Sequence, residues 1–402
     1  MEPNCFIHKE GAKVFYEYFI SFFLAFIIAF SSTPIAKKLA FNIGAVDIPK
    51  DNRRMHKKPI ARLGGLAIVA GFVVSVMFSI AGSALGLKTV FQPDVQLMGI
   101  LAGVAIIVGI GIVDDIRQLG ARIKLVFQIA AAVVVVSTGT VIENFTNPFS
   151  VVGVSQLSPY ISYPLTVLWI VGITNAINLI DGLDGLAAGV SSIASLSLFF
   201  ISIIQEDWNT AIVTAALAGS ALGFLPYNFN PAKIFMGDTG ATFLGFTLGV
   251  ISIQGMYKSF TAIAIAVPLL VLGLPIFDTA FAILRRLVQG KSIMQADRGH
   301  LHHKLIDMGL SHKQSVVVMY VASGALGLCA IVLADKGVLG AIILFIAVSV
   351  FIVGGARYMS EISDGSEEED AGDGTDTEEK DKTTEDEEKK TRNVIIEKIN
   401  ES

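Results

Sequence analysis

The chain has 402 residues and a formal net charge of −5 at pH 7, and 53% of its residues are hydrophobic, which gives a mean hydropathy of +0.65. Apolar residues occur in runs long enough to cross a bilayer, about 18–25 residues each. This composition excludes a soluble globular protein and indicates a polytopic membrane protein. The two cysteines, Cys5 and Cys329, are far apart in sequence, so a disulfide framework or a cysteine zinc site is not expected. We expect no nucleic-acid partner.

Eleven apolar segments predict an all-α polytopic membrane protein with about eleven transmembrane helices. Because the number is odd, the two termini are expected on opposite sides of the bilayer. We expect residues 1–360 to form one multi-span membrane domain. The approximate limits of the segments are 14–36, 63–87, 96–113, 123–140, 162–180, 185–204, 210–227, 239–256, 260–284, 314–334 and 338–356.

The last 42 residues, 361–402, differ sharply from the rest of the chain. They carry 17 acidic and 6 basic side chains, whereas the other 360 residues carry 18 acidic and 24 basic ones. A low-complexity, highly charged segment without aromatic residues cannot bury enough apolar surface to fold alone. We therefore expect an acidic, disordered tail after a membrane domain that is itself basic.

The distribution of Lys and Arg predicts the orientation. Loops on one side of the predicted spans hold 18 of these residues, and loops on the other side hold five. Cytoplasmic loops of membrane proteins carry the excess of positive charge. The N-terminus is therefore expected outside and the C-terminus in the cytoplasm.

The polar clusters of the chain all fall at the predicted cytoplasmic side. They form one shallow layer and do not line a path across the bilayer. An ion-coupled transporter places its ionisable residues near the bilayer midplane more often. The pattern instead favours an enzyme that acts on a lipid headgroup.

Asp114 and Asp115 end the third predicted span. Carboxylates at a helix C-terminus are disfavoured by the helix dipole, which weakens a purely structural interpretation. Adjacent hard oxygen ligands suit Mg²⁺, whose octahedron is completed by water and by substrate phosphate. We interpret this pair as part of a metal-dependent site.

The stretch NAINLIDGLDG, residues 175–185, places two amides and two carboxylates at the end of the fifth predicted span. Positions three apart share a helix face only with their neighbours, so the run as a whole does not lie on one face. Gly182 and Gly185 allow the chain to leave helical geometry there. We interpret the stretch as a helix end that bends around a ligand. Its polar residues are Asn175, Asn178, Asp181 and Asp184.

Two further segments suit the binding of anions. In GDTG, residues 237–240, Asp238 precedes an apolar helix, where it either caps the helix or binds a metal that holds a phosphate. Lys233 is the only basic residue on that loop and suits a phosphate contact. In RGHLHH, residues 298–303, the imidazoles suit phosphate or sugar oxygens, and zinc is disfavoured because no nearby cysteine completes a ligand set.

The basic loop at residues 55–68 meets the second predicted span at a glycine pair. Its positive charge serves either the orientation in the membrane or, through Arg62, the approach of a nucleotide phosphate. Carboxylates for Mg²⁺ and cations for phosphates are the groups that phosphoryl transfer needs. No GxxxxGK[ST] loop occurs, so ATP hydrolysis is not expected.

Five segments together resemble the successive signatures of the polyprenyl-phosphate N-acetylhexosamine-1-phosphate transferases. They are HKKPIARLGG, GIVDDIRQLGARIKLVFQ, NAINLIDGLDGL, KIFMGDTG and HLHHKLIDMGLSHKQ, in the family's order across residues 56–314. The HxxPxARxGG loop and HLHH look like the WecA/TagO branch, whereas the related MraY translocases typically have a PTMGG-like loop and HHH. Eleven spans also suit the WecA type better than the ten of MraY.

The resemblance implies a role for each matching residue. The catalytic group would comprise Asp114 and Asp115 with the histidines of HLHH, and Mg²⁺, with Mn²⁺ as a substitute, would be the cofactor. The histidines are His300, His302 and His303. The metal ligands would be Asn178, Asp238 and Asp115. The substrate-binding residues would be Arg62, Lys124, Asn175, Asp181, Asp184, Lys233 and Arg298, among which Lys124 would hold the lipid phosphate.

The implied reaction moves GlcNAc-1-phosphate from UDP-GlcNAc to undecaprenyl phosphate, releases UMP, and begins a surface polysaccharide or teichoic acid at the cytoplasmic face of a bacterial plasma membrane. A phosphate monoester is mostly dianionic at neutral pH and hardly needs a general base. Direct attack by the lipid phosphate is therefore favoured over a two-step route through an aspartyl-phosphate. The MraY-type donor, an ion-coupled transporter and a structural scaffold remain the alternatives, and a homodimer is left open.

Overall fold

The computed structural model describes residues 4–48, 59–86, 89–146, 154–254, 263–291 and 299–373, and nearly all of them are helical. The chain divides into two compact units, Met1–Ile342 and Ile343–Ser402. The core and all the site residues considered below belong to the first unit. Residues 374–402 of the expected acidic tail, and Arg298, lie outside the described residues.

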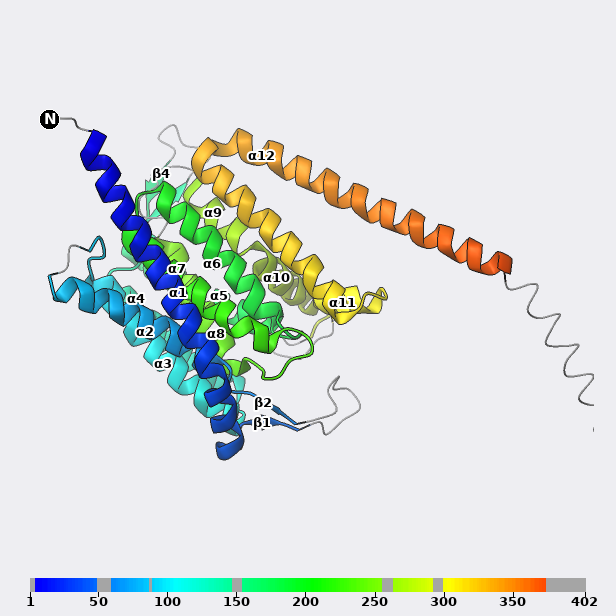
Figure 1. Ribbon diagram of the computed structural model, residues 1–402, viewed down its shortest axis with the longest axis horizontal. Helices are drawn as coiled ribbons and strands as arrows, with labels where there is room; N and C mark the ends of the chain where they lie inside the picture. Colours follow the sequence, from blue (N-terminus) through cyan, green and yellow to red (C-terminus); the bar gives the residue numbers. More distant parts are fainter. Residues whose placement is uncertain are drawn as a thin grey trace, which may run out of the picture. The chain divides into compact units, whose positions relative to one another are not determined.

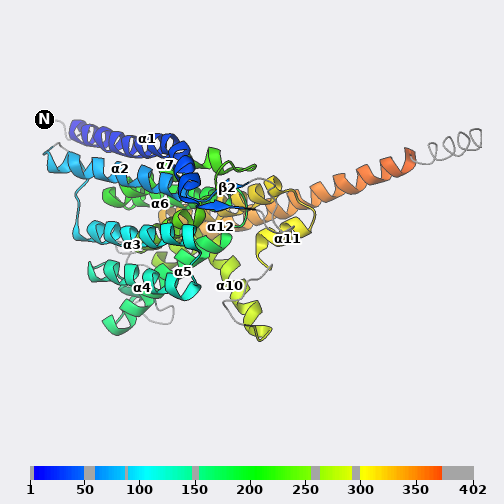
Figure 2. The ribbon, with the colours of Figure 1, turned by 90° about the horizontal axis from the view of Figure 1, so that it is seen from below.

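The helices follow one another through short connections, and two small antiparallel hairpins interrupt them. In the hairpin β1–β2, which lies beside the C-terminal end of α1, Val46 pairs with Ala61 (Figure 1). In β3–β4, Phe145 pairs with Ser155. The helices α1 to α4 run along a common direction (Figure 2). The elements are α1 (Asn4–Ile43), β1 (Val46–Asp47), β2 (Ile60–Ala61), α2 (Gly65–Ala84), α3 (Val95–Arg117), α4 (Ala121–Ser137), β3 (Asn144–Thr146), β4 (Val154–Gln156), α5 (Pro159–Ile180), α6 (Leu186–Ile204), α7 (Trp208–Asn228), α8 (Gly237–Gln254), α9 (Ile263–Val271), α10 (Gly273–Val288), α11 (Leu301–Asp307) and α12 (His312–Asp373).

Within the described residues, seven helices are long and apolar enough to cross a bilayer. The bent pair α9–α10, whose axes differ by 84°, makes an eighth if it counts as one span. The structure is nearly all-helical and agrees with the expected polytopic membrane protein, but the expected count of eleven spans is not confirmed. Two predicted spans, 314–334 and 338–356, are assigned to the single helix α12, with non-helical backbone at Gly337.

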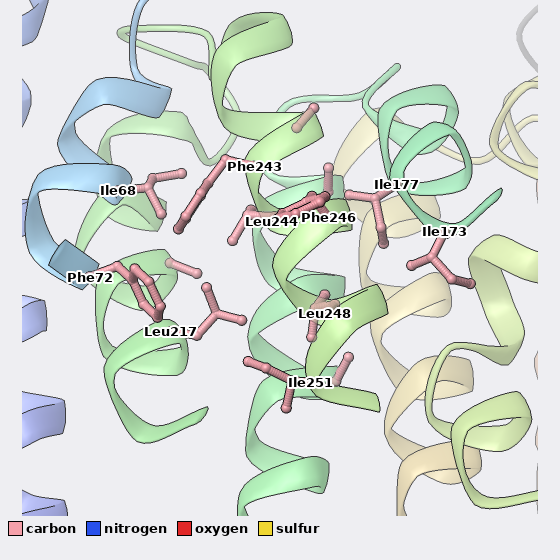
Figure 3. Close-up of a cluster of buried hydrophobic side chains, with 14 of the residues drawn as sticks. Ile68, Phe72, Ile173, Ile177, Leu217, Phe243, Leu244, Phe246, Leu248 and Ile251 are labelled. Carbon is pink, nitrogen blue, oxygen red and sulfur yellow. The ribbon is translucent and has the colours of Figure 1, made fainter. Parts of the chain in front are cut away.

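The helix α8 corresponds to the predicted span 239–256, although it is not among the seven helices counted above. It is surrounded by other helices, and nearly all its residues from Thr239 to Ile253 are buried. Figure 3 shows its side chains Phe243 and Phe246 packed among side chains of α2, α5 and α7. A helix shielded from lipid can carry glycine and threonine, so its sequence is less apolar than that of a helix exposed to lipid.

The outer surface of the helices is apolar, as expected for contact with lipid. Large side chains there are strongly exposed, with Leu168 at 68%, Phe281 at 65% and Phe19 at 58%. A soluble protein rarely leaves so much contiguous apolar surface in water. The exposed side chains therefore agree with a membrane environment for this helical bundle.

Close backbone approach positions α8 against its neighbours. A Cβ on Gly65 of α2 would overlap the backbone of Gly240. A Cβ on Gly111 of α3 would lie 2.6 Å from Cα of Thr239. Small residues let helices in membranes approach one another in this way. The two contacts hold the N-terminal end of α8 tightly between α2 and α3.

Two glycines of α3 give a matched test of this packing. We expect Gly111→Ala to destabilise the protein by about 1–3 kcal/mol, because the new methyl group overlaps the α8 backbone. In contrast, a Cβ on Gly109 would meet no atom within 4 Å, so Gly109→Ala should be neutral or slightly stabilising. Thermal unfolding of the purified protein in detergent measures both. Equal effects of the two substitutions would contradict the close approach of α3 and α8.

Candidate active site

A polar cavity of about 600 Å³ lies where the ends of several helices meet. Its walls come from segments that are far apart in the sequence, including the β1–β2 hairpin, the turn after α5, the segment between α7 and α8, and the start of α12. It therefore brings the predicted polar clusters to one place. The polar residues that line it are Asp47, Arg62, Asn178, Asp181, Asp184, Asn228, Asn230, Asp238, His303 and His312.

Asp115 anchors the beginning of α8. Its side chain is buried near the C-terminal end of α3, and its Oδ1 accepts the backbone N–H of Asp238 at 2.8 Å. Its Oδ2 accepts the backbone N–H of Thr239 at 3.0 Å and the hydroxyl of Thr239 at 2.6 Å. Three of the four or so lone-pair positions of a carboxylate are thus occupied. Asp115 fills the place of an N-terminal cap, although it comes from a different helix.

The residue before Asp238 must be glycine for this contact to form. Gly237 has a φ of +73°, a conformation that residues with a side chain rarely adopt. A Cβ at this position would also overlap the carbonyl oxygen of Arg62 and lie 2.5 Å from Oδ2 of Asp115. The turn thus brings the backbone of Arg62, just after β2, close to the Asp115 carboxylate and the start of α8.

Lys124 connects two carboxylates at the same end of the bundle. Its Nζ lies 2.9 Å from Oδ2 of Asp114 and 3.1 Å from Oδ2 of Asp238. Asp114 also accepts the backbone N–H of Leu119 at 2.6 Å, which fixes the turn between α3 and α4. The Lys124 side chain is 25% exposed, whereas that of Asp114 is 2% exposed. The ammonium group therefore remains accessible to an anion, but Asp114 does not line the cavity.

A second group of hydrogen bonds holds another part of the cavity wall. Oδ2 of Asp184 accepts from Nδ2 of Asn230 and from the backbone N–H of Ala232, both at 3.0 Å. The backbone N–H of Asp184 donates to Nε2 of His312 at 3.1 Å. The buried Asn228 accepts the N–H of Gly185 at 3.1 Å. The DGLDG turn is therefore attached to the segment between α7 and α8 and to α12.

Asp181 also lines the cavity. Its pKa is raised to about 7, chiefly by burial and further by the carboxylates of Asp238 and Asp115, while Arg62 opposes the rise. A carboxyl group in this state gains from a nearby cation, which would favour its ionised form. The cavity thus has an excess of negative charge that Arg62 and Lys124 only partly offset.

The three histidines of HLHH occupy different environments. His300 is buried, and its Nδ1 lies 2.8 Å from Oδ2 of Asp278, whose Oδ1 accepts the N–H of Leu301 at 2.7 Å. His302 is buried against Gly182, and its pKa is lowered to about 4, chiefly by burial and also by the neighbouring His303. Of the three, only His303 lines the cavity. Direct substrate contact is therefore favoured for His303, whereas His300 and His302 attach α11 to α10 and to the DGLDG turn.

Arg62 is brought to the cavity by β2. The N–H groups of Gly64 and Gly65 donate to the carbonyls of Phe235 and Met236 at 2.9 and 2.8 Å. The N–H of Phe235 donates in turn to Ala61 at 2.8 Å. The start of α2 is thus hydrogen-bonded to the segment that precedes Asp238. The loop on which Arg62 was predicted to reach a phosphate does reach the cavity.

Two predicted substrate-binding residues lie elsewhere. Asn175 donates to Oε1 of Gln128 at 2.7 Å and to the carbonyl of Val171 at 2.8 Å, so it joins α5 to α4 and does not line the cavity. Lys233 is exposed and lines a separate, mainly apolar cavity of about 650 Å³ between α1 and α7. That second cavity shares Asn230 and Pro231 with the first.

Five residues that sequence reasoning did not assign contribute to the site. Asp47, Asn228, Asn230 and His312 line the cavity, and Asp278 holds His300. Asn228 stands two positions before Asn230–Pro231, a dipeptide typical of turns, and Asp278 is a carboxylate within an apolar segment, so both carried a signal. His312 lies in HLHHKLIDMGLSHKQ, one of the five segments that resemble the family, but no role of its own was predicted for it.

The donor set of the cavity fits a hard divalent cation. In the part of the chain that the structure describes, no three carboxylate, imidazole or thiol groups are arranged to hold a metal ion by themselves. Mg²⁺ usually takes only one or two carboxylates and completes its shell with water and substrate phosphate. The cavity offers such oxygen donors at Asn178, Asp181 and Asp238. A metal role for Asp115 stays a prediction, because the contacts of its carboxylate are with α8.

Comparison with known proteins places this geometry in a family. The pattern of glycosyl transferase family 4 matches residues 97–256. The probable undecaprenyl-phosphate N-acetylglucosaminyl 1-phosphate transferase of Bacillus subtilis is 43% identical over 317 residues, which cover 79% of this chain and 85% of that protein. The decaprenyl-phosphate N-acetylglucosaminephosphotransferase of Mycolicibacterium smegmatis is 35% identical, with 80% and 84% covered. The undecaprenyl-phosphate alpha-N-acetylglucosaminyl 1-phosphate transferase of Salmonella typhi is 29% identical, with 73% and 77% covered. The chain belongs to the polyprenyl-phosphate N-acetylhexosamine-1-phosphate transferase family, in its WecA/TagO-like branch.

Proposed function

We propose that the protein transfers GlcNAc-1-phosphate from UDP-GlcNAc to a polyprenyl phosphate, such as undecaprenyl phosphate, and releases UMP. The names of the relatives from three genera support the acceptor and the sugar. One structural observation carries the proposal. A polar cavity lined by carboxylates lies at one end of a bundle whose outer surface is apolar. The partly exposed Lys124 lies beside this cavity, in contact with Asp238. That arrangement lets a water-soluble sugar nucleotide and a lipid phosphate meet.

We propose that the donor diphosphate lies at the Asp238 side of the cavity. Asp238, with Asn178 and Asp181, would hold Mg²⁺, which supplies charge neutralisation to the diphosphate. Arg62 reaches the same wall and would bind a phosphate oxygen. Asp115 acts on Asp238 through the backbone, because it fixes the turn from which the Asp238 side chain extends.

Lys124 is the proposed contact of the acceptor phosphate. It lies between Asp114 and Asp238 and remains partly exposed, so an incoming dianion can replace part of its contact with the carboxylates. The attacking group is already ionised at neutral pH and needs orientation more than deprotonation. Neither Asp114 nor Asp115 lines the cavity, which supports direct attack on the β-phosphorus over a route through an aspartyl-phosphate on this pair.

We also propose the finer membrane topology. Eleven spans with the N-terminus outside and the cavity on the cytoplasmic face agree with the excess of Lys and Arg on that side. Lys313, at the start of α12, would then face the cytoplasm, and Asp335 would face the outside. Labelling of single cysteines placed at these two positions, from each side of sealed vesicles, tests this. Labelling of both from the same side would contradict it.

The transfer reaction is testable with purified protein in detergent. We expect a lipid-linked GlcNAc diphosphate by mass spectrometry, with stoichiometric UMP, when UDP-GlcNAc, undecaprenyl phosphate and Mg²⁺ are supplied. A chelator should abolish turnover and excess Mg²⁺ should restore it. Asp238→Asn should lower turnover by about a hundredfold or more, since it removes a charged metal ligand. The control Asp335→Asn changes an exposed carboxylate outside the cavity and should retain full activity.

Two results of this experiment would contradict the proposal. One is the absence of UMP release by wild-type protein that is folded and saturated with Mg²⁺. The other is full turnover by Asp238→Asn. A panel of other UDP-sugars in the same assay identifies the donor if UDP-GlcNAc is not used.

We propose that residues 1–360 contain all the catalytic machinery and that the acidic tail is dispensable for chemistry. Every residue assigned above to the cavity precedes residue 320. Truncation after Met359 should therefore keep in vitro turnover within about twofold of the full chain, because it removes no residue that lines the cavity. A folded truncated protein with little turnover would show that the tail takes part in catalysis.

A further inference from the structure

The first residue of α12, His312, belongs to the cavity wall, although no separate role was predicted for it from the sequence. Its Nε2 accepts the backbone N–H of Asp184 at 3.1 Å. Ser311 and Gln314 hold the beginning of α12 in place. The N–H of Ser311 donates to Oε1 of Gln314 at 2.8 Å, and the N–H of Gln314 donates to Oγ of Ser311 at 3.3 Å. The imidazole is thus held by both its helix and its hydrogen bond.

The hydrogen bond to Asp184 determines which nitrogen of His312 carries a proton. A ring nitrogen that accepts a backbone N–H must be unprotonated, so the neutral ring carries its proton on Nδ1. Among the described residues, Nδ1 of His312 has no hydrogen-bond partner. The ring therefore offers a positioned N–H donor beside the cavity.

Tyr320 shows that His312 is not needed merely to attach the DGLDG turn to α12. Tyr320, two turns further along α12, donates its hydroxyl to the carbonyl of Gly185 at 2.5 Å, and it does not line the cavity. The DGLDG turn is therefore already attached to α12 without His312. A second anchor at the cavity wall, with a donor left over, points to contact with a ligand.

The position of His312 indicates which part of a ligand it would contact. It belongs to the hydrogen-bonded group of Asp184, Asn230 and Ala232, whereas the proposed metal and phosphate contacts belong to the group of Asp238 and Lys124. Both groups line or adjoin one cavity of about 600 Å³. A sugar nucleotide with its diphosphate at Asp238 would extend its nucleoside toward the Asp184 group.

We infer that His312 binds the nucleoside part of the donor, by donating from Nδ1 to a carbonyl or hydroxyl oxygen of the uridine. This inference rests on the proposed function and adds a substrate contact to it. His312 is a substrate-binding residue in this account, and it takes no part in the transfer of the phosphoryl group. Loss of the His312 side chain should weaken the binding of the donor and leave the binding of the acceptor unchanged.

Three substitutions distinguish the two hydrogen bonds of the ring. In His312→Gln, the side-chain amide reaches the position of Nε2 and can accept the N–H of Asp184, but no group replaces Nδ1. In His312→Asn, the shorter amide replaces Nδ1 as a donor and leaves Asp184 without its acceptor. His312→Ala removes both. The matched control is Lys313→Ala, an exposed neighbour on the same helix that does not line the cavity.

The readouts are KM for UDP-GlcNAc, KM for undecaprenyl phosphate, and the affinity of the detergent-solubilised protein for UMP by calorimetry. We expect His312→Gln to raise the donor KM and weaken UMP binding by about three- to tenfold, the effect of one lost hydrogen bond. The acceptor KM and the unfolding temperature should stay at wild-type values. If His312→Gln does not fold, His312→Asn decides, and it should keep UMP affinity closer to wild type than His312→Ala does.

Wild-type donor KM and UMP affinity in His312→Gln would overturn the inference, because the ring would then serve only as an anchor. An equal rise of the donor and acceptor KM would overturn it as well. Failure of wild-type protein to turn over UDP-GlcNAc would instead refute the proposed function. The two failures are distinguishable, because UMP affinity is measured without turnover.

Discussion

The site depends on one buried carboxylate placed at the start of a helix to which it does not belong. Burial of an ionised group within a membrane bundle is costly unless hydrogen bonds and a favourable field compensate for it. Asp115 obtains both from the first turn of α8, whose free N–H groups and dipole favour a negative charge. The same contact fixes the turn that carries Asp238 and, through Asp238, the position of the Lys124 ammonium group. The packing of α3 on α8 and the geometry of the cavity therefore depend on each other.

The part of the cavity wall formed by the DGLDG turn is built on the same principle. The DGLDG turn has left helical geometry, with Gly185 at a φ of +82°, so its backbone groups need partners. Asn228, His312 and Tyr320 supply them from α7 and α12. The turn before Asp238 and the DGLDG turn are thus both irregular segments, and helices hold them in place. A cavity of this kind is largely formed before a ligand binds, which reduces the free energy needed to order it.

The sequence predicted much of this site because ionisable residues at the ends of apolar segments have few structural explanations. Asp114–Asp115, the DGLDG carboxylates and Asp238 were all placed at one surface, and the structure brings them together. Roles that depend on tertiary partners were beyond reach. Nothing local shows that Asn175 pairs with Gln128, or that His300 is bound to Asp278. The count of eleven spans rested on apolar runs alone, and two of those runs, 314–334 and 338–356, belong to the single helix α12.

A double-mutant cycle between Asp115 and Thr239 tests the central contact most directly. The free energy of unfolding would be measured for wild type, Asp115→Ala, Thr239→Val and the double variant. We predict a coupling of about 1–3 kcal/mol, because the hydroxyl of Thr239 contributes through the Asp115 carboxylate and its loss costs little once that carboxylate is absent. Strictly additive losses would contradict the account, since Asp115 would then act independently of the start of α8.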